Sequence, residues 1–114
     1  MNEDVYMLVK RILDNNYYLN GVIDYLEGDL LALNSDEFNT VVEVSNIKEL
    51  YRMLRNYNGV FKYKNLLFFN SCQYGTFVYD IDVAKQDPSR YVEHLSVNCI
   101  DFKRFKSIIG KLAY

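Results

Sequence analysis

The 114-residue sequence contains no tryptophan, one proline, one histidine and two cysteines. With a single histidine and no cysteine cluster, it lacks residues spaced to hold a zinc ion. Glycine-rich phosphate loops, the Gly-x-Ser-x-Gly nucleophile elbow and the His-Glu-x-x-His motif are also missing. These absences predict a protein that is not an enzyme and that carries no metal or cofactor.

Long hydrophobic runs are missing as well. No apolar stretch approaches the roughly 18 residues of a membrane-spanning helix, and the acidic start at Glu3 and Asp4 is unlike a signal peptide. We therefore expect an intracellular protein with no membrane partner. Cys72 and Cys99 belong to no Cys-x-x-Cys pair, so we expect free thiols.

The chain is rich in hydrophobic residues, which make up 50% of it and include 11 tyrosines and 7 phenylalanines. This composition is typical of an ordered globular protein, so we expect one domain over residues 1–114 with a largely aromatic core. The net charge of −2 excludes a wholly basic protein that coats nucleic acid, but it leaves local basic patches open.

The first half of the chain predicts a helix followed by three strands. Apolar residues over 5–13 recur with helical spacing. Strands are then expected at 22–25, 30–33 and 40–44, with turns at Glu27-Gly28-Asp29 and at 34–37.

The next segment repeats this order. Asn46 lies three residues before Glu49, which is the spacing of a helix-capping box, and strands are expected at 60–63, 66–69 and 76–79. Asn20-Gly21-Val22 matches Asn58-Gly59-Val60 at the first strand of each unit. We therefore interpret the chain as an internal duplication, with one repeat over about 5–45 and the other over about 46–83.

The remaining segment predicts a loop over 84–90, a strand at 94–97 and a helix capped by Asp101. The expected fold class is α+β. It consists of two tandem α-β-β-β units with an antiparallel sheet, helices packed on one face, and a C-terminal strand and helix over about 91–114.

Charge is distributed unevenly along the chain. Residues 20–45 contain six acidic side chains and no basic one, whereas the helices that follow expose cations opposite their apolar stripes. Such a basic surface suits phosphates or an acidic partner, although amphipathic helices also need solvated charge. The candidate binding residues are Lys48, Arg52, Arg55, Lys103, Arg104, Lys106 and Lys111.

Three further features have a structural and a functional interpretation. His94 has no second ligand or base nearby in the sequence, so a structural or surface role is the simpler explanation. Asp80 and Asp82 alternate as on one face of a strand, which suits either a divalent metal or solvation. Tyrosines such as Tyr17, Tyr18, Tyr57 and Tyr91 would be interface anchors if exposed and core residues if buried; core packing is the default.

A repeated helix-and-strands unit with basic helices and an acidic sheet resembles the domain of DNA sliding clamps. Residues 28–36 look like the clamp pattern of a glycine turn, an apolar strand and a polar turn, and Asp87-Pro88-Ser89-Arg90 is similar to a tetrapeptide common in archaeal and eukaryotic clamps. The resemblance implies a DNA-associated homo-oligomer in which the seven candidate cations contact the DNA backbone.

Three kinds of function therefore compete. The first is a non-catalytic binding protein that docks on a host protein, such as an accessory or inhibitor protein of phage or mobile-element type. It is favoured by the missing catalytic motifs, the many tyrosines, and an abundance of Asn, Tyr, Lys and Ile that suggests an AT-rich genome. The alternative is a clamp-like DNA-associated protein, and a small enzyme is the second alternative.

Overall fold

The structure is a computed structural model that describes residues 3–19 and 41–114. In these ranges a five-stranded sheet has its strands in the order of the sequence, from β1 to β5. The strands are β1 (Val41–Glu43), β2 (Gly59–Tyr63), β3 (Leu66–Ser71), β4 (Gly75–Asp80) and β5 (Glu93–Leu95). The helices are α1 (Glu3–Asn15), α4 (Ile47–Asn56), α5 (Ile81–Gln86) and α6 (Phe102–Leu112), with short 3-10 turns η1 (Tyr17–Leu19) and η3 (Val97–Cys99). The predicted α+β class is confirmed.

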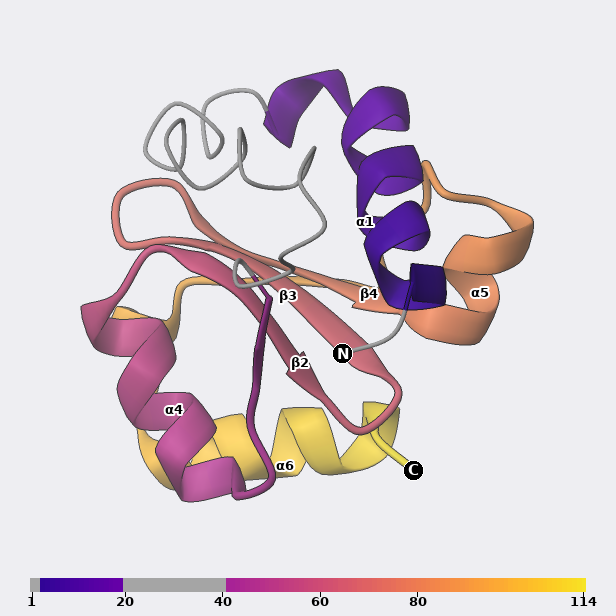
Figure 1. Cartoon of the computed structure of the whole chain (residues 1–114). Coiled ribbons are helices and arrows are strands. Elements are labelled where there is room, and N and C mark those ends of the chain that lie inside the picture. Colours follow the sequence, from indigo (N-terminus) through magenta and orange to yellow (C-terminus); the bar gives the residue numbers. More distant parts are fainter. Residues whose placement is uncertain (1–2, 20–40) are drawn as a thin grey trace.

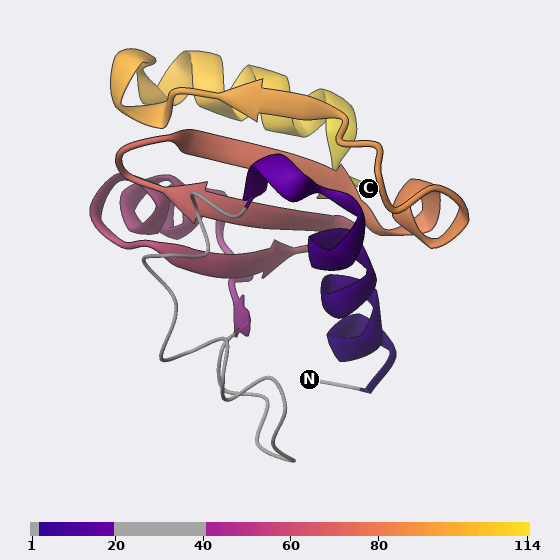
Figure 2. The same cartoon turned by 90° about the horizontal axis from the view of Figure 1, so that it is seen from above.

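Helices cover both faces of this sheet, and the prediction that they pack on one face is wrong (Figures 1 and 2). The apolar stripe of α1 packs against one face, where Val60, Leu67 and Tyr79 lie. Helices α4 and α6 pack against the other face, around Phe61 and Phe68. The reason is the composition of the central strands: all six residues of β3 are buried, so both of its faces need a cover.

The sheet is also mixed, where the sequence predicted an antiparallel one. Strands β2 to β5 pair antiparallel, but β1 pairs parallel to β2, with Val41 opposite Val60. A hairpin joins antiparallel neighbours, whereas α4 lies between β1 and β2 and returns the chain to the same end of the sheet.

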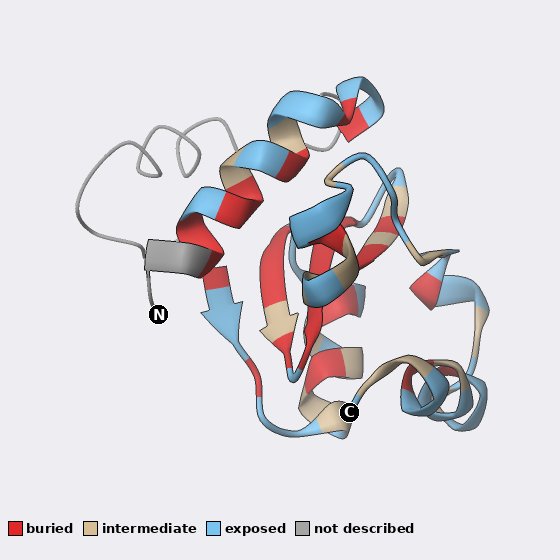
Figure 3. Ribbon diagram, turned by 90° about the vertical axis from the view of Figure 1, so that its right-hand side faces the viewer, coloured by how far each residue is buried: buried red, intermediate tan, exposed pale blue. Residues whose placement is uncertain are grey.

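The second predicted repeat is present as a helix followed by the three strands β2, β3 and β4. From the first repeat, α1 and the third strand are found where expected. The two strands predicted at 22–25 and 30–33 lie outside the described residues, so the duplication stays a prediction. The stripe of buried residues along α1 faces the sheet in Figure 3.

The region after β4 corrects a third prediction. Residues 81–86 form α5, where the sequence predicted strand-like alternation around Asp80 and Asp82 and a loop over 84–90. Asp80 ends the strand because its Oδ1 accepts a hydrogen bond from the backbone N–H of Val83 at 3.0 Å, which caps a helix. Asp80 and Asp82 therefore do not share a strand face.

The C-terminal elements follow the prediction. Strand β5 overlaps the expected strand, and Asp101 caps α6 by accepting a hydrogen bond from the N–H of Arg104 at 2.8 Å. Phe105 and Ile109 are fully buried between α6 and the sheet. In the described ranges, no helix is long and apolar enough to cross a membrane.

Candidate binding groove on helix α4

Helix α4 has one buried and one exposed side because its sequence is amphipathic. Asn46 caps the first turn by accepting a hydrogen bond from the N–H of Glu49 at 3.0 Å, as the capping-box spacing predicts. Leu50 and Leu54 are buried against the sheet, with exposed fractions of 0% and 1%. The side chains on the opposite side of the helix face solvent, and the apolar ones at its borders are partly buried against the same core.

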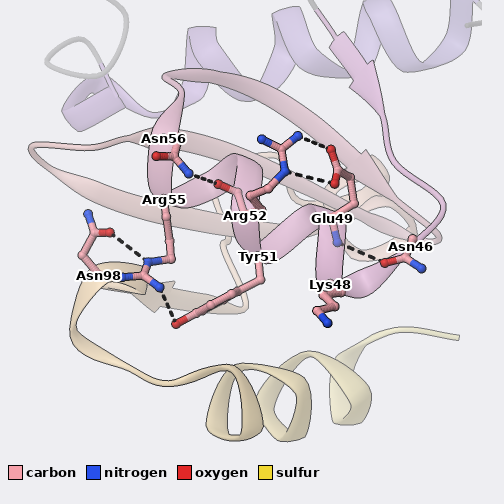
Figure 4. A pocket seen from close by; sticks show the side chains of 8 residues that line it. All are labelled: Asn46, Lys48, Glu49, Tyr51, Arg52, Arg55, Asn56 and Asn98. Atoms are coloured by element: carbon pink, nitrogen blue, oxygen red, sulfur yellow. Dashed lines mark hydrogen bonds and ion pairs between the residues drawn. The ribbon is translucent and has the colours of Figure 1, made fainter.

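An open groove of about 780 Å³ lies along this exposed side, and Figure 4 shows it from close by. It is large enough for part of a peptide or a small molecule. Its lining side chains are mostly basic, amide or aromatic, and all but one come from α4 or its cap: Asn46, Lys48, Glu49, Tyr51, Arg52, Arg55, Asn56 and Asn98.

Arg55 is held in place at one end of the groove. Its Nε donates to Oδ1 of Asn98 at 3.4 Å, and its Nη1 donates to the hydroxyl of Tyr51 at 3.3 Å. Its guanidinium carbon also lies 5.1 Å from the centroid of the Tyr51 ring, a cation–π contact. These contacts fix the plane of the guanidinium group, and the residue as a whole stays exposed.

Tyr51 is itself fixed by the neighbouring helix. Its hydroxyl donates to the carbonyl of Ile100 at 2.6 Å, and its ring packs against Phe102 and Phe105, with centroids 5.5 Å and 5.1 Å away. The position of Arg55 thus depends on the packing of α6.

Arg52 is paired within the groove. Two of its nitrogens donate to the two carboxylate oxygens of Glu49, and both side chains are about half exposed. The hydrogen bonds from Arg52 lower the pKa of the Glu49 carboxyl, and those to Glu49 raise the pKa of Arg52. An exposed pair of this kind adds little stability, but it neutralises the charge that Arg52 presents.

The structure brings three of the seven predicted cations to the groove and places the other four on α6. Lys48 has no side-chain partner among the described residues, whereas Arg52 and Arg55 have the contacts given above. Helices α4 and α6 lie side by side on the same face of the sheet (Figure 1). All four cations of α6 are exposed, and none of them lines the groove: Lys103, Arg104, Lys106 and Lys111.

The other candidates from the sequence have structural partners. The ring of His94 stacks on Phe77 with centroids 4.2 Å apart, and its Nε2 lies 3.3 Å from the carbonyl oxygen of Tyr74. Asp80 accepts a hydrogen bond from Nδ2 of Asn65 at 2.6 Å in addition to its cap. Within residues 3–19 and 41–114 no group of three or more ligating side chains could hold a metal ion.

The tyrosines that the sequence offered as interface anchors are exposed. Tyr17 is 87% exposed, and Tyr18, Tyr57 and Tyr91 lie between 42% and 52%. Tyr57 directly follows α4, where it contributes to the raised pKa of Arg52.

Cys72 and Cys99 are exposed free cysteines.

Sequence reasoning missed the residues that position Arg55. The four-residue spacing between Tyr51 and Arg55 is one at which helical side chains meet, so it was the signal that could have indicated this contact. Asn98 is 43 residues from Arg55 in the chain, so no local pattern connects them.

No family model, curated protein or solved structure matches this chain.

Proposed function

We propose that this protein is a non-catalytic binding protein that docks on another protein through the α4 groove. The groove carries the proposal because arginine and tyrosine, which dominate binding energy in protein interfaces, meet there in a fixed arrangement. Arg55 is already held by Tyr51 and Asn98, so docking orders fewer side-chain rotamers and costs less entropy. An accessory or inhibitor protein of phage or mobile-element type would work in this way.

Clamp-like association with DNA is the second candidate function. It is supported by the position of α4 and α6 on one face of the sheet, with all seven predicted cations exposed. Their positive charge would act on phosphates at many points, and binding would weaken steeply with salt.

A comparison of two double variants tests the proposal. The first, Lys48→Ala with Arg55→Ala, removes two positive charges from the groove. The matched control, Lys85→Ala with Arg90→Ala, removes the same charge from α5 and the segment after it, which lie near α1 and away from α4. Each protein is immobilised and exposed to nuclease-treated extract of the host cells, and retained proteins are quantified by mass spectrometry.

We expect a protein that the wild type and the control retain and that the groove variant loses by tenfold or more, as for removal of an interface hot spot. Equal retention by all three proteins would contradict docking through the groove. If an untreated extract yields retained material that nuclease treatment removes, and duplex DNA binds with a steep salt dependence, the second candidate replaces the first.

A further inference from the structure

We infer that the α4 groove recognises an acidic helix of its protein partner, one that presents two carboxylates two turns apart. This inference rests on the proposed function and adds the chemical class of the ligand. It follows from which cations the groove leaves available, how far apart they are, and where Glu49 lies.

Only two of the three groove cations have charge available for a ligand. Arg52 is neutralised by its two hydrogen bonds to Glu49. Arg55 uses Nε and Nη1 for Asn98 and Tyr51, and both partners are neutral, so its positive charge is not compensated by them. Lys48 has no side-chain partner in the part of the chain that the structure describes. Lys48 and Arg55 are therefore the two sites for anionic groups.

These two residues lie on one line along the helix. Seven residues correspond to about two helical turns and a rise of about 10.5 Å. A partner helix with carboxylates at positions i and i+7 has the same spacing along its own axis. Side chains on one face of an extended strand repeat at about 6.7 Å and 13 Å, so a strand matches this spacing less well.

Charge favours a protein ligand over a nucleic acid. Glu49 and Arg52 form a neutral pair between Lys48 and Arg55, so the groove lacks the continuous row of uncompensated cations that a nucleic-acid backbone would contact. A partner with two separate carboxylates can place them at Lys48 and Arg55 and avoid Glu49. The net charge of −2 adds no long-range attraction for a polyanion.

Synthetic peptides test the spacing directly. One alanine- and glutamine-based peptide carries Glu at positions i and i+7, and a control of equal charge carries Glu at i and i+5, which places the two groups on different sides of the helix. Binding to the full-length protein is followed through the backbone amide signals of Lys48, Arg55 and Asn98 in two-dimensional nitrogen–proton NMR spectra, which detect millimolar affinity.

We expect the i, i+7 peptide to shift these signals at concentrations at least fivefold lower than the i, i+5 peptide. Arg55→Lys, which keeps the charge but loses the planar group, should weaken binding about threefold or more. Glu49→Gln should strengthen it about threefold, because Arg52 loses its carboxylate partner and its positive charge becomes available to the peptide. Lys85→Ala should leave the affinity unchanged.

Equal binding of the two peptides, or no shift at millimolar peptide, would overturn the inference. A tighter interaction of the same amides with a short DNA duplex would overturn it in favour of nucleic acid. In either case a protein partner that the Lys48→Ala, Arg55→Ala variant fails to retain would still support docking through the groove, so the two proposals fail separately.

Discussion

Replacement of Asn70 by alanine should destabilise the protein by about 3 kcal/mol, because this side chain joins the end of α4 to the sheet. Asn70 is 1% exposed. Its Nδ2 donates to the carbonyls of Leu54 at 2.8 Å and Tyr57 at 2.7 Å, and its Oδ1 accepts from the hydroxyl of Thr76. Leu54 is in the last turn of α4, where carbonyls have no partner within the helix.

The magnitude follows from the number of groups left without a partner. A hydrogen bond contributes about 1 kcal/mol net, and a buried group that loses its partner costs about 1–3 kcal/mol. Three such bonds give about 3 kcal/mol for Asn70→Ala. Thr76→Val removes one of the three and should cost about 1 kcal/mol. In the double variant the shared bond is lost once, so its cost should fall about 1 kcal/mol below the sum of the two single variants.

Urea unfolding followed by circular dichroism measures these differences, provided that the slope of the transition is unchanged. Asn56→Ala is the matched control. Its Nδ2 donates to the carbonyl of Arg52 at 2.7 Å on the exposed side of the same helix, so its loss should cost less than about 0.5 kcal/mol. If Asn70→Ala costs no more than Asn56→Ala, or if the costs of Asn70→Ala and Thr76→Val simply add, the buried network does not stabilise the junction.

Two further predictions concern other parts of the fold. Gly75 has φ of +96°, and an added Cβ would lie 2.8 Å from Nε2 of His94, so Gly75→Ala should cost about 2 kcal/mol in the same urea assay. Gly110 in α6 has open space around it, so Gly110→Ala should stabilise the protein by about 0.5–1 kcal/mol. Equal effects of the two substitutions would exclude strain at Gly75. The hydrogen bond to the Asp82 carboxylate raises the pKa of Tyr114 to about 12. This contact therefore contributes stability below about pH 10, and the contribution is lost as the pH rises through about 12. In an NMR titration Asp82→Asn should return the pKa of Tyr114 towards 10, and an unchanged pKa would rule out this cause.

The elements with strong local patterns could be predicted from the sequence. The capping box at Asn46 and the apolar stripe that follows it predict α4, and the observed helix begins at Ile47. Strands β2, β3 and β4 are found within one or two residues of their predicted bounds. Each of these elements is specified by neighbours within a few residues, which is the range that periodicity and capping describe.

Features that depend on how the elements pack were predicted less well. The run from Leu66 to Phe69 has no alternation of apolar and polar residues, which is typical of a strand buried on both faces. This missing alternation indicates that both faces of the sheet are covered, which is why the prediction of helices on one face was wrong. The sequence around Asp80 carries two signals: an alternation that predicts a strand, and an aspartate that can cap a helix. The helix forms because the carboxylate of Asp80 accepts a hydrogen bond from the N–H of Val83.

The candidate groove shows the same division between local and tertiary information. The spacing of Lys48, Arg52 and Arg55 placed them on the exposed side of α4, as observed. The spacing did not distinguish their states, because Arg52 pairs with Glu49 within one turn whereas Arg55 is held by Asn98 from η3. The helical spacing therefore predicted where the three positive charges lie, but it did not predict which of them are already paired and which can contact a ligand.

The geometry of the groove depends on parts of the fold outside α4. Helix α4 has ten residues, and an isolated helix of that length is marginal in water. Its geometry in the protein comes from Leu50 and Leu54, which are buried against the sheet, and from the hydrogen bonds of Asn70 to its last turn. The orientation of Arg55 comes from Tyr51, which α6 holds in place. A peptide with the sequence of α4 would carry the same charges without the fixed guanidinium plane, so the arrangement of charged groups on this surface is a property of the packed sheet and its two helices.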